Sequence, residues 1–370
     1  LPEQDKRHYL FREYIRVLDR LRPAAFVMEN VKGMLSSTVE SRLVFEMLMD
    51  DLSSLGTRRG HHYDIRAIRV ENGKASLQDA NQPSDFIVRA EEFGIPQRRH
   101  RVIIVGIRSD LAHRAQGACI DVCGKERTVN DAIGTMIALR SGISRGRDDA
   151  SVWRCQVSEA ATLLASIYSG KHDVALRKAF SSLAKRVKIR SPILRSTSRL
   201  PEGYGASDDE LLQWLERPEL RAIAQHETRG HMESDLNRYL FAATFGMTRG
   251  FSPKAADFPI ELRPDHRNWH TGIFNDRFRV QLAHKASTTV TSHISKDGHY
   301  FIHPDPMQCR SLTVRARARP QTVPDSYLFL GNRTQQYIQV GNAVPPFLAR
   351  QIADLILAGL CGKRLKPSYK

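Results

Sequence analysis

The sequence predicts an α/β fold: a partial doubly wound sheet joined to an irregular α+β region. Residues 63–70 and 101–107 have the apolar patterns of strands, whereas residues 8–21 and 38–55 repeat apolar side chains at helical spacing. Strand and helix patterns therefore alternate along the first part of the chain, as they do in α/β sheets. From about residue 109 this alternation stops, which indicates a second region of different architecture.

The first elements follow from spacing and from residues that end them. Residues 8–21 form an amphipathic helix, and Pro23 separates it from a strand at residues 25–29. Residues 38–55 are expected to form a second amphipathic helix, closed by Gly56.

The next elements are strands. Residues 63–70 alternate as a half-buried strand does, residues 85–89 are expected to form a short strand, and residues 101–107 (RVIIVGI) form a continuous apolar run of the buried type.

The later region is expected to be less regular. Between residues 109 and 230 we expect short helices and no continuation of the sheet. Residues 271–330 read as irregular and β-rich, with a strand at residues 287–291. A last amphipathic helix is predicted at residues 345–360, with proline at its start.

Composition indicates a soluble globular protein that is attracted to polyanions. The 370 residues include 56 Lys plus Arg and 40 Asp plus Glu, which gives a net charge of +16. Arginine outnumbers lysine about three to one, and arginine is the better residue for bidentate phosphate and guanine contacts. Residues 171–199 carry many cations against the single acid Asp173, which fits either a surface facing phosphates or a solvated helix face.

The cysteines and apolar runs bear on the compartment. Five irregularly spaced cysteines favour a reducing compartment over a disulfide framework, and no metal site is expected at Cys119 and Cys123. No apolar run in the sequence is long enough to predict a membrane span, and residues 1–5 do not resemble a signal peptide. We expect a cytoplasmic protein without a membrane partner.

Three segments in this order carry a family resemblance: AFVMENV at residues 25–31, GIPQRRHR at residues 94–101, and GNAVPP at residues 341–346. Together they resemble the later motifs of the DNA (cytosine-5) methyltransferases. The resemblance implies a sheet like that of S-adenosylmethionine-dependent methyltransferases, S-adenosyl-L-methionine as cofactor, and double-stranded DNA as partner. It also implies an activity of restriction–modification type on a flipped cytosine.

Glu29 ends an apolar strand, where ligand crevices of α/β sheets lie. Carbon 5 of cytosine is a poor nucleophile, and covalent attack at carbon 6 with protonation at ring nitrogen 3 overcomes this. A carboxylic acid can share a proton with that nitrogen and accept a hydrogen bond from the exocyclic amine. The resemblance assigns this role to Glu29; a lone glutamate at a strand end is more often a helix cap or salt-bridge partner.

The resemblance also assigns the remaining site residues. Arg99 and Arg101 would act beside Glu29 by holding the base and neighbouring phosphate, because guanidinium groups bind both oxygen types. Asn342 and Val344 would line the methionine side of the cofactor pocket, after a tight turn at Gly341. Four residues are assigned to substrate DNA: Gln97, Arg310, Thr313 and Arg315.

The segment at residues 311–325 departs from the family pattern at three positions. Ala316 stands where the family commonly has glutamate, and Pro320 and Val323 stand where leucine and phenylalanine are usual. A proline inside the short helix expected there would cost about 3 kcal/mol.

Two family motifs are not in this sequence. It has no Pro-Cys dipeptide, which carries the family's nucleophile, and no Phe-x-Gly-x-Gly turn for the cofactor. We therefore expect the C-terminal part of a methyltransferase. Residues 1–108 and 335–370 would form a partial catalytic domain and residues 109–334 a target-recognition domain.

The expected partner is a separate N-terminal methyltransferase chain that supplies the cysteine. The competing hypothesis is a catalytically inactive DNA-binding remnant or subunit. An RNA-modifying enzyme is disfavoured because the recognition region has no evident aromatic stacking platform.

Overall fold

The chain folds into two compact units. Unit 1 comprises Leu1–Gly94, Arg98–Glu126 and Phe347–Lys370, and unit 2 comprises Ile95–Gln97 and Arg127–Pro346. The computed structural model describes residues 10–39, 41–55, 62–122, 125–146, 148–169, 173–264, 275–290 and 298–361. Relative to the expected boundaries, residues 109–126 belong with the first unit and residues 335–346 with the second.

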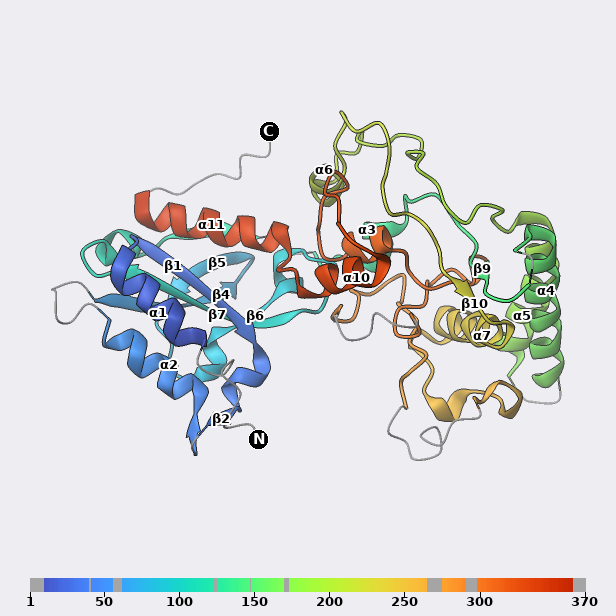
Figure 1. The fold of residues 1–370 in the computed structure, drawn as a ribbon, viewed down its shortest axis with the longest axis horizontal. Helices are drawn as coiled ribbons and strands as arrows, with labels where there is room; N and C mark the ends of the chain where they lie inside the picture. Colours follow the sequence, from blue (N-terminus) through green and yellow to red (C-terminus); the bar gives the residue numbers. More distant parts are fainter. Residues whose placement is uncertain are drawn as a thin grey trace. The chain divides into compact units, whose positions relative to one another are not determined.

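A mixed α/β architecture with a central sheet forms unit 1 (Figure 1). Its six strands are β1 (Ala25–Val31), β4 (Tyr63–Glu71), β5 (Lys74–Gln78), β6 (Ile87–Arg89), β7 (His100–Arg108) and β8 (Cys119–Asp121). The order is β1-β7-β4-β5-β8, and β6 also pairs with β7. All pairings among these strands are antiparallel. The doubly wound pattern predicted parallel neighbours, but β7 lies between β1 and β4 and runs opposite to both.

Helices cover both faces of this sheet. They are α1 (Leu10–Leu21), α2 (Val44–Ser53) and α11 (Pro346–Cys361). Val102 and Ile104 of β7 pack in one cluster with the apolar side chains of α1 and α2, whereas the alternate residues Ile103 and Val105 are equally buried on the other face. Figure 1 shows α11 on the side of the sheet away from α1 and α2. Burial on both faces explains the continuous apolar run of β7 and contributes about 1.5–3 kcal/mol per large side chain.

The strands predicted at residues 63–70 and 101–107 and the final helix are confirmed, with ends shifted by one residue. The helix predicted over residues 38–55 is wrong at its start. β2 (Thr38–Val39) and β3 (Arg42–Leu43) form a small antiparallel pair before α2 begins. Ser41 has φ 65°, a left-handed conformation that a right-handed helix cannot include. Gly56 lies outside the described residues.

The expectation that the sheet does not continue after residue 109 is also wrong. β8, three residues long, pairs Cys119 with Ser76 and Ile120 with Ala75 at the edge of the sheet. So short a strand gives no detectable alternation in the sequence.

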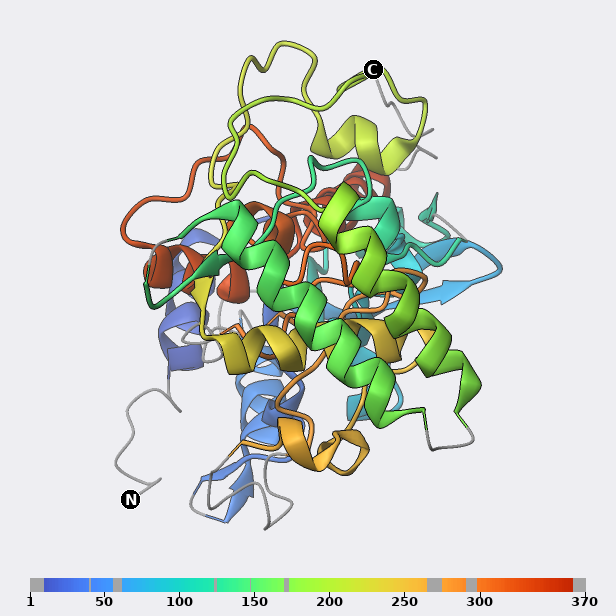
Figure 2. The ribbon, with the colours of Figure 1, turned by 90° about the vertical axis from the view of Figure 1, so that its right-hand side faces the viewer.

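Unit 2 is mainly helical. Its helices are α3 (Val129–Ile133), α4 (Ala150–Ile167), α5 (Val174–Arg190), α6 (Glu210–Leu215), α7 (Glu233–Arg249), α9 (Val314–Ala318) and α10 (Arg333–Asn342). Figure 2 shows α4 and α5, the two green helices, lying side by side. They pack with α7 around a core that includes the fully buried Trp153, Phe180 and Tyr239.

The β-rich character expected for residues 271–330 is not present in the described part. Single bridges join Val280 to Ile302 and Ile302 to Ser311, and Ser287 bridges to Gln97. Residues 287–290 of the expected strand make no further ladder, and Thr291 lies outside the described residues. Two short strands, β9 (Gly142–Ile143) and β10 (Gly230–His231), pair in parallel.

One stretch, Arg333–Cys361, is long and apolar enough to pass a membrane-span criterion based on length and composition. It consists of α10 and α11, with Ala343 between them in an extended conformation. Core helices of soluble proteins pass the same criterion, so this finding is weak evidence for a membrane span.

Candidate active site and recognition core

The carboxylate of Glu29 lies against the guanidinium of Arg101. In the β1–β7 register Glu29 faces Ile103 and Val31 faces Arg101, so the Glu29 and Arg101 side chains are diagonal neighbours on one sheet face. Nε of Arg101 is 3.0 Å from Oε1 of Glu29. This face is the one opposite α1 and α2, because the alternate residue Phe26 packs in their cluster.

Both members of this ion pair are partly buried. The side chains of Arg101 and Glu29 are 16% and 29% exposed, so both are partly withdrawn from water. Burial lowers the pKa of Arg101, and the Glu29 carboxylate opposes this shift. No hydrogen-bond partner for the second oxygen, Oε2 of Glu29, lies among the described residues. That oxygen is therefore available for another group.

Arg99 brings a second guanidinium to the same carboxylate. Only 3% of Arg99 is exposed, and burial together with the positive charge of Arg101 lowers the pKa of Arg99 to about 10, while Glu29 acts in the opposite direction. Glu29 is thus paired with Arg101, and Arg99 lies near enough for its charge to interact with both. An arrangement of this kind can hold a polar or anionic group.

The segment that leads into β7 is fixed at several points. A short 3-10 helix, Ala90–Phe93, ends at Gly94, whose φ of 70° is readily reached by glycine. The backbone N–H of Ala90 donates to the carbonyl of Arg99 at 3.0 Å. Nε2 of His100 lies 2.7 Å from Oε1 of Glu91. Arg98 instead forms an ion pair with Glu126 in which both side chains are more than half exposed.

Gln97 precedes the arginines of its motif and has partners of its own. It belongs to unit 2 and is fully buried, where its Oε1 accepts a hydrogen bond from the backbone N–H of Val290 at 3.4 Å. The adjacent Pro96 carbonyl accepts from the N–H of Ser287 at 2.9 Å. In this conformation Gln97 ties two segments of unit 2 together.

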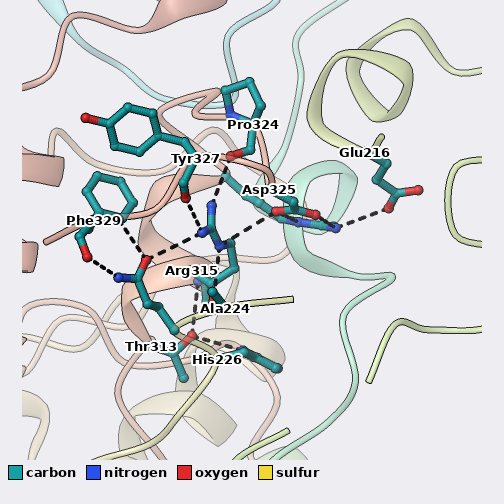
Figure 3. Close-up of polar contacts among 12 residues, drawn as sticks. Glu216, Ala224, His226, Thr313, Arg315, Pro324, Asp325, Tyr327 and Phe329 are labelled. Atoms are coloured by element: carbon teal, nitrogen blue, oxygen red, sulfur yellow. Dashed lines mark hydrogen bonds and ion pairs between the residues drawn. The ribbon is translucent and has the colours of Figure 1, made fainter. Parts of the chain in front are cut away.

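Arg315 is the centre of a buried polar network in unit 2 (Figure 3). Its guanidinium donates to three backbone carbonyls, those of Ala224, Pro324 and Tyr327, at 3.1, 3.0 and 2.6 Å. Burial lowers the pKa of Arg315, and Asp325 at 3.9 Å opposes this. A guanidinium has five N–H donors, and these carbonyls meet most of that demand without exposure to water.

Arg319 is neutralised by two carboxylates. Its Nη2 lies 2.5 Å from Oδ2 of Asp325 and 3.2 Å from Oε1 of Glu216, and its Nη1 donates to the Ala132 carbonyl. Tyr204 donates a hydrogen bond to Asp325, and burial raises the pKa of this tyrosine. Glu216 and Tyr204 are distant in sequence from the motif, and no sequence pattern singles them out.

Thr313 begins α9 and connects it to His226. Oγ1 of Thr313 accepts from the backbone N–H of Ala316 and lies 3.0 Å from Nδ1 of His226. Nε2 of His226 is 2.8 Å from the Ile137 carbonyl, so this nitrogen carries the proton. Burial, followed by the positive charge of Arg310, lowers the pKa of His226 to about 3.

Arg310 has similar surroundings. It is 1% exposed, and it donates to the side chain of Gln308 and to the Ser311 carbonyl. Arg310, Thr313 and Arg315 were expected to contact DNA. Their side chains lie inside unit 2 with intramolecular partners, so direct contact is not available to them in this conformation.

The three departures from the family pattern fit this packing. α9 ends at Ala318, and Pro320 follows the C-cap residue Arg319, so the cost of a proline inside the helix does not arise. Ala316 is fully buried, and Val323 is 4% exposed in the same apolar cluster. The departures therefore leave no break in the helix or its core.

The tight turn expected at Gly341 is wrong. Gly341 and Asn342 are the last residues of α10, and the chain changes direction at Ala343, which has φ −62° and ψ 138°. Asn342 and Val344 are both exposed. Neither residue lines the three cavities of about 350, 1030 and 450 Å³ in unit 2. The two residues therefore do not by themselves enclose a cofactor of the S-adenosylmethionine type.

None of the described cysteines lies on β1 or β7, the strands that carry Glu29 and Arg101. Cys119 is on β8, at the opposite edge of the sheet, four strand spacings or about 19 Å from β1. Cys309 is buried in unit 2, where burial raises the pKa of its thiol. Cys155 and Cys361 are exposed on α4 and at the end of α11. Cys123 lies outside the described residues, within which we find no cluster suited to a metal ion.

A comparison with protein families identifies the chain. Residues 2–358 match the family described as C-5 cytosine-specific DNA methylase. The chain belongs to this family. Its curated relatives in the methylase family include the type II methyltransferase M.Bpa9945I of Bacillus paralicheniformis, which is 32% identical over 359 residues. The match covers 95% of this chain and 65% of that relative.

Two more distant matches are a curated relative and a solved structure. The DNA (cytosine-5-)-methyltransferase M.ApeKI of Aeropyrum pernix is 26% identical, over 95% of this chain and 75% of its own length. A crystal structure of a prophage-encoded DNA modification methyltransferase from E. coli is 17% identical, with a TM-score of 0.49. That match covers 96% of this chain and 75% of the other.

Proposed function

We propose that this chain supplies the base-holding carboxylate and the DNA-recognition unit of a cytosine-5 DNA methyltransferase of restriction–modification type. The observation that carries the proposal is the ion pair of Glu29 with Arg101 on one sheet face, with the charge of Arg99 nearby, in a protein of the methylase family. The type II methyltransferase names of its relatives support the restriction–modification assignment. The substrate is a cytosine flipped out of duplex DNA in the cytoplasm of a bacterium.

Glu29 acts at the pyrimidine ring. When protonated, its carboxyl donates the proton to ring nitrogen 3 as a thiolate adds to carbon 6, so the electron pair pushed into the ring is stabilised at carbon 5. Its other oxygen accepts a hydrogen bond from the exocyclic amine. Arg101 fixes the orientation of the carboxyl, and Arg99 and Arg101 supply positive charge for the base carbonyl oxygen or a neighbouring phosphate.

The thiolate comes from a polypeptide segment outside these 370 residues. Pro-Cys is absent from the sequence, and the described cysteine of the sheet, Cys119, is at the far edge from β1. Among the described strands β1 pairs with β7 alone, so no described strand pairs with its other edge. An unpaired strand edge is a template for pairing with another strand. The proposed partner is a separate N-terminal methyltransferase chain.

The family implies a methyl donor of the S-adenosylmethionine type, which would supply the methyl group when bound. Because Asn342 and Val344 do not enclose such a molecule, the same partner would contribute the glycine turn of its pocket. Arg310, Thr313 and Arg315 would act as positioning residues that hold the recognition unit in shape rather than as direct DNA contacts.

Reconstitution tests the proposal. The chain is mixed with the part of M.Bpa9945I that it does not match, or with the product of the reading frame immediately upstream of its gene. Transfer of a labelled methyl group to mixed-sequence duplex DNA is then measured. We expect transfer with the partner and none without it. Specific DNA binding without transfer in any combination would favour an inactive DNA-binding subunit.

A further inference from the structure

Helix α5 has an unusual distribution of charge. One side of it is buried against α4 and α7 through Leu176, Phe180, Leu183 and Val187. Every cation on the helix is exposed, and no acidic residue occurs between Val174 and Arg190. The cations are Arg177, Lys178, Lys185, Arg186, Lys188 and Arg190. Among the described residues, no carboxylate forms an ion pair with any of these six.

Four of these cations lie on one strip. At 100° per residue, Arg177, Lys178, Lys185 and Lys188 fall within an arc of about 100° on the side away from the buried stripe. We call these four residues the α5 cationic strip. Two small hydroxyl residues, Ser181 and Ser182, lie between its two ends. Hydroxyl groups donate hydrogen bonds to phosphate, and small side chains allow another backbone to approach closely.

Helix stability gives no reason for the strip. Lys185 and Lys188 are like charges three residues apart, which destabilises a helix by a few tenths of a kcal/mol. Cations near the C-terminus are favoured by the helix dipole, but Arg177 and Lys178 follow the first turn, near the positive end. The acid at that end, the N-cap residue Asp173, is already paired with Arg249.

We propose that the α5 cationic strip is a second DNA-contact surface, one that grips the phosphate backbone of duplex DNA independently of sequence. Charge complementarity favours duplex DNA as the partner: the four cations have no carboxylate partner within the described part of the chain, whose net charge over the full sequence is +16, and the chain belongs to a DNA methylase family. From Arg177 to Lys188 the strip spans about 17 Å, or about five base-pair steps of a duplex. The inference rests on the proposed function only in that both require duplex DNA.

The test compares two fourfold variants with equal loss of charge. One replaces the strip with glutamine (R177Q, K178Q, K185Q, K188Q). The control removes four exposed cations of unit 1 (R12Q, R16Q, R20Q, R42Q). Binding of a fluorescent duplex of 30 base pairs is measured from 50 to 300 mM salt. Thermal unfolding establishes that both variants fold.

Each phosphate contact contributes about 0.9 to the slope of log K against log salt concentration. We expect the strip variant to lose about 2 to 3.6 from this slope and to bind roughly tenfold or more weakly, equally for every duplex sequence. The control should keep most of the wild-type slope. An equal loss in both variants, or none in the strip variant, would overturn the inference.

Other outcomes separate the two proposals. If wild-type protein shows no salt-dependent duplex binding, both are overturned. If binding follows the expected pattern but reconstitution gives no methyl transfer, the strip stands and the proposed catalytic role fails. Binding of the strip to anionic lipid vesicles with no preference for DNA would also overturn the inference.

Discussion

Glu29 and Arg101 sit diagonally across the β1–β7 pair, with Nε of Arg101 3.0 Å from Oε1 of Glu29. The strand register fixes this contact. Arg101 is opposite Val31, which is two residues from Glu29 along β1, so the Arg101 and Glu29 side chains emerge on the same face of the sheet. The contact orients one carboxylate oxygen and leaves the other available. A carboxyl held in this way suits the proton transfer that we propose for Glu29.

Replacing Glu29 by glutamine should abolish proton donation while preserving shape. In the reconstituted system we expect E29Q to lower the rate of methyl transfer by about 10² to 10⁴, the usual contribution of general acid catalysis. Duplex affinity should change by less than threefold, because DNA binding does not depend on this carboxyl. The measurement is a single-turnover rate beside a binding isotherm. A rate within threefold of wild type would remove Glu29 from the mechanism.

Replacing Asp325 by alanine should strongly destabilise unit 2. Both Asp325 and Arg319 are fully buried, and removal of one partner leaves an uncompensated charge, which costs about 3–5 kcal/mol. The matched control is D50A, whose ion pair with Arg42 is 60–70% exposed and should contribute about 1 kcal/mol or less. Urea unfolding of both variants measures the difference. Equal costs would contradict the buried network.

Acid should weaken unit 2 through His226. Its folded pKa is lowered to about 3 against 6.5 in the unfolded chain, so the unfolded state binds more protons between these values. Stability contributed by neutral His226 is therefore complete above pH 6.5 and is lost as the pH falls toward 3. In H226Q the dependence of unfolding free energy on pH should be shallower by up to about 1.4 kcal/mol per pH unit. Unfolding at pH 7, 6 and 5 tests this, and parallel curves would argue against it.

Gly106 should tolerate no larger side chain. A Cβ built on it would lie 2.1 Å from the ring of Phe26, a residue of β1 that is buried in one cluster with side chains of α1 and α2. We expect G106A to lower the free energy of unfolding by about 1–3 kcal/mol, the range for overpacked cores. G33A, where no atom lies within 4 Å, is the control. A melting temperature for G106A equal to that of G33A would show that the ring moves freely.

Long periodic segments were predictable from sequence, whereas pairings were not. The strand at residues 101–107 and the helix at residues 345–360 have enough apolar repeats to define their type. Residues 38–43 continue a helical pattern but bend at Ser41, a local backbone preference that periodicity does not reveal. The antiparallel insertion of β7 depends on contacts between segments distant in sequence, so alternation of strands and helices could not reveal it.

The candidate site shows the same division. The motif around Glu29 predicted a carboxylate at the end of a strand, whereas β1 continues to Val31. Its partner Arg101 lies in the other recognisable motif. The burial of Arg310, Arg315 and Arg319 was not predictable, because arginine is rarely buried without partners. Those partners are mostly backbone carbonyls, together with Asp325 of the same segment and Glu216, which no motif identifies.

We propose that this chain holds the base and recognises DNA while another polypeptide supplies the nucleophile. The most direct measurement is transfer of a labelled methyl group to duplex DNA by the purified chain, alone and with a partner containing Pro-Cys. We expect no methyl transfer by the chain alone and transfer with the partner. That transfer should be lost when the partner's cysteine is replaced by serine. Transfer by the chain alone would contradict the proposal.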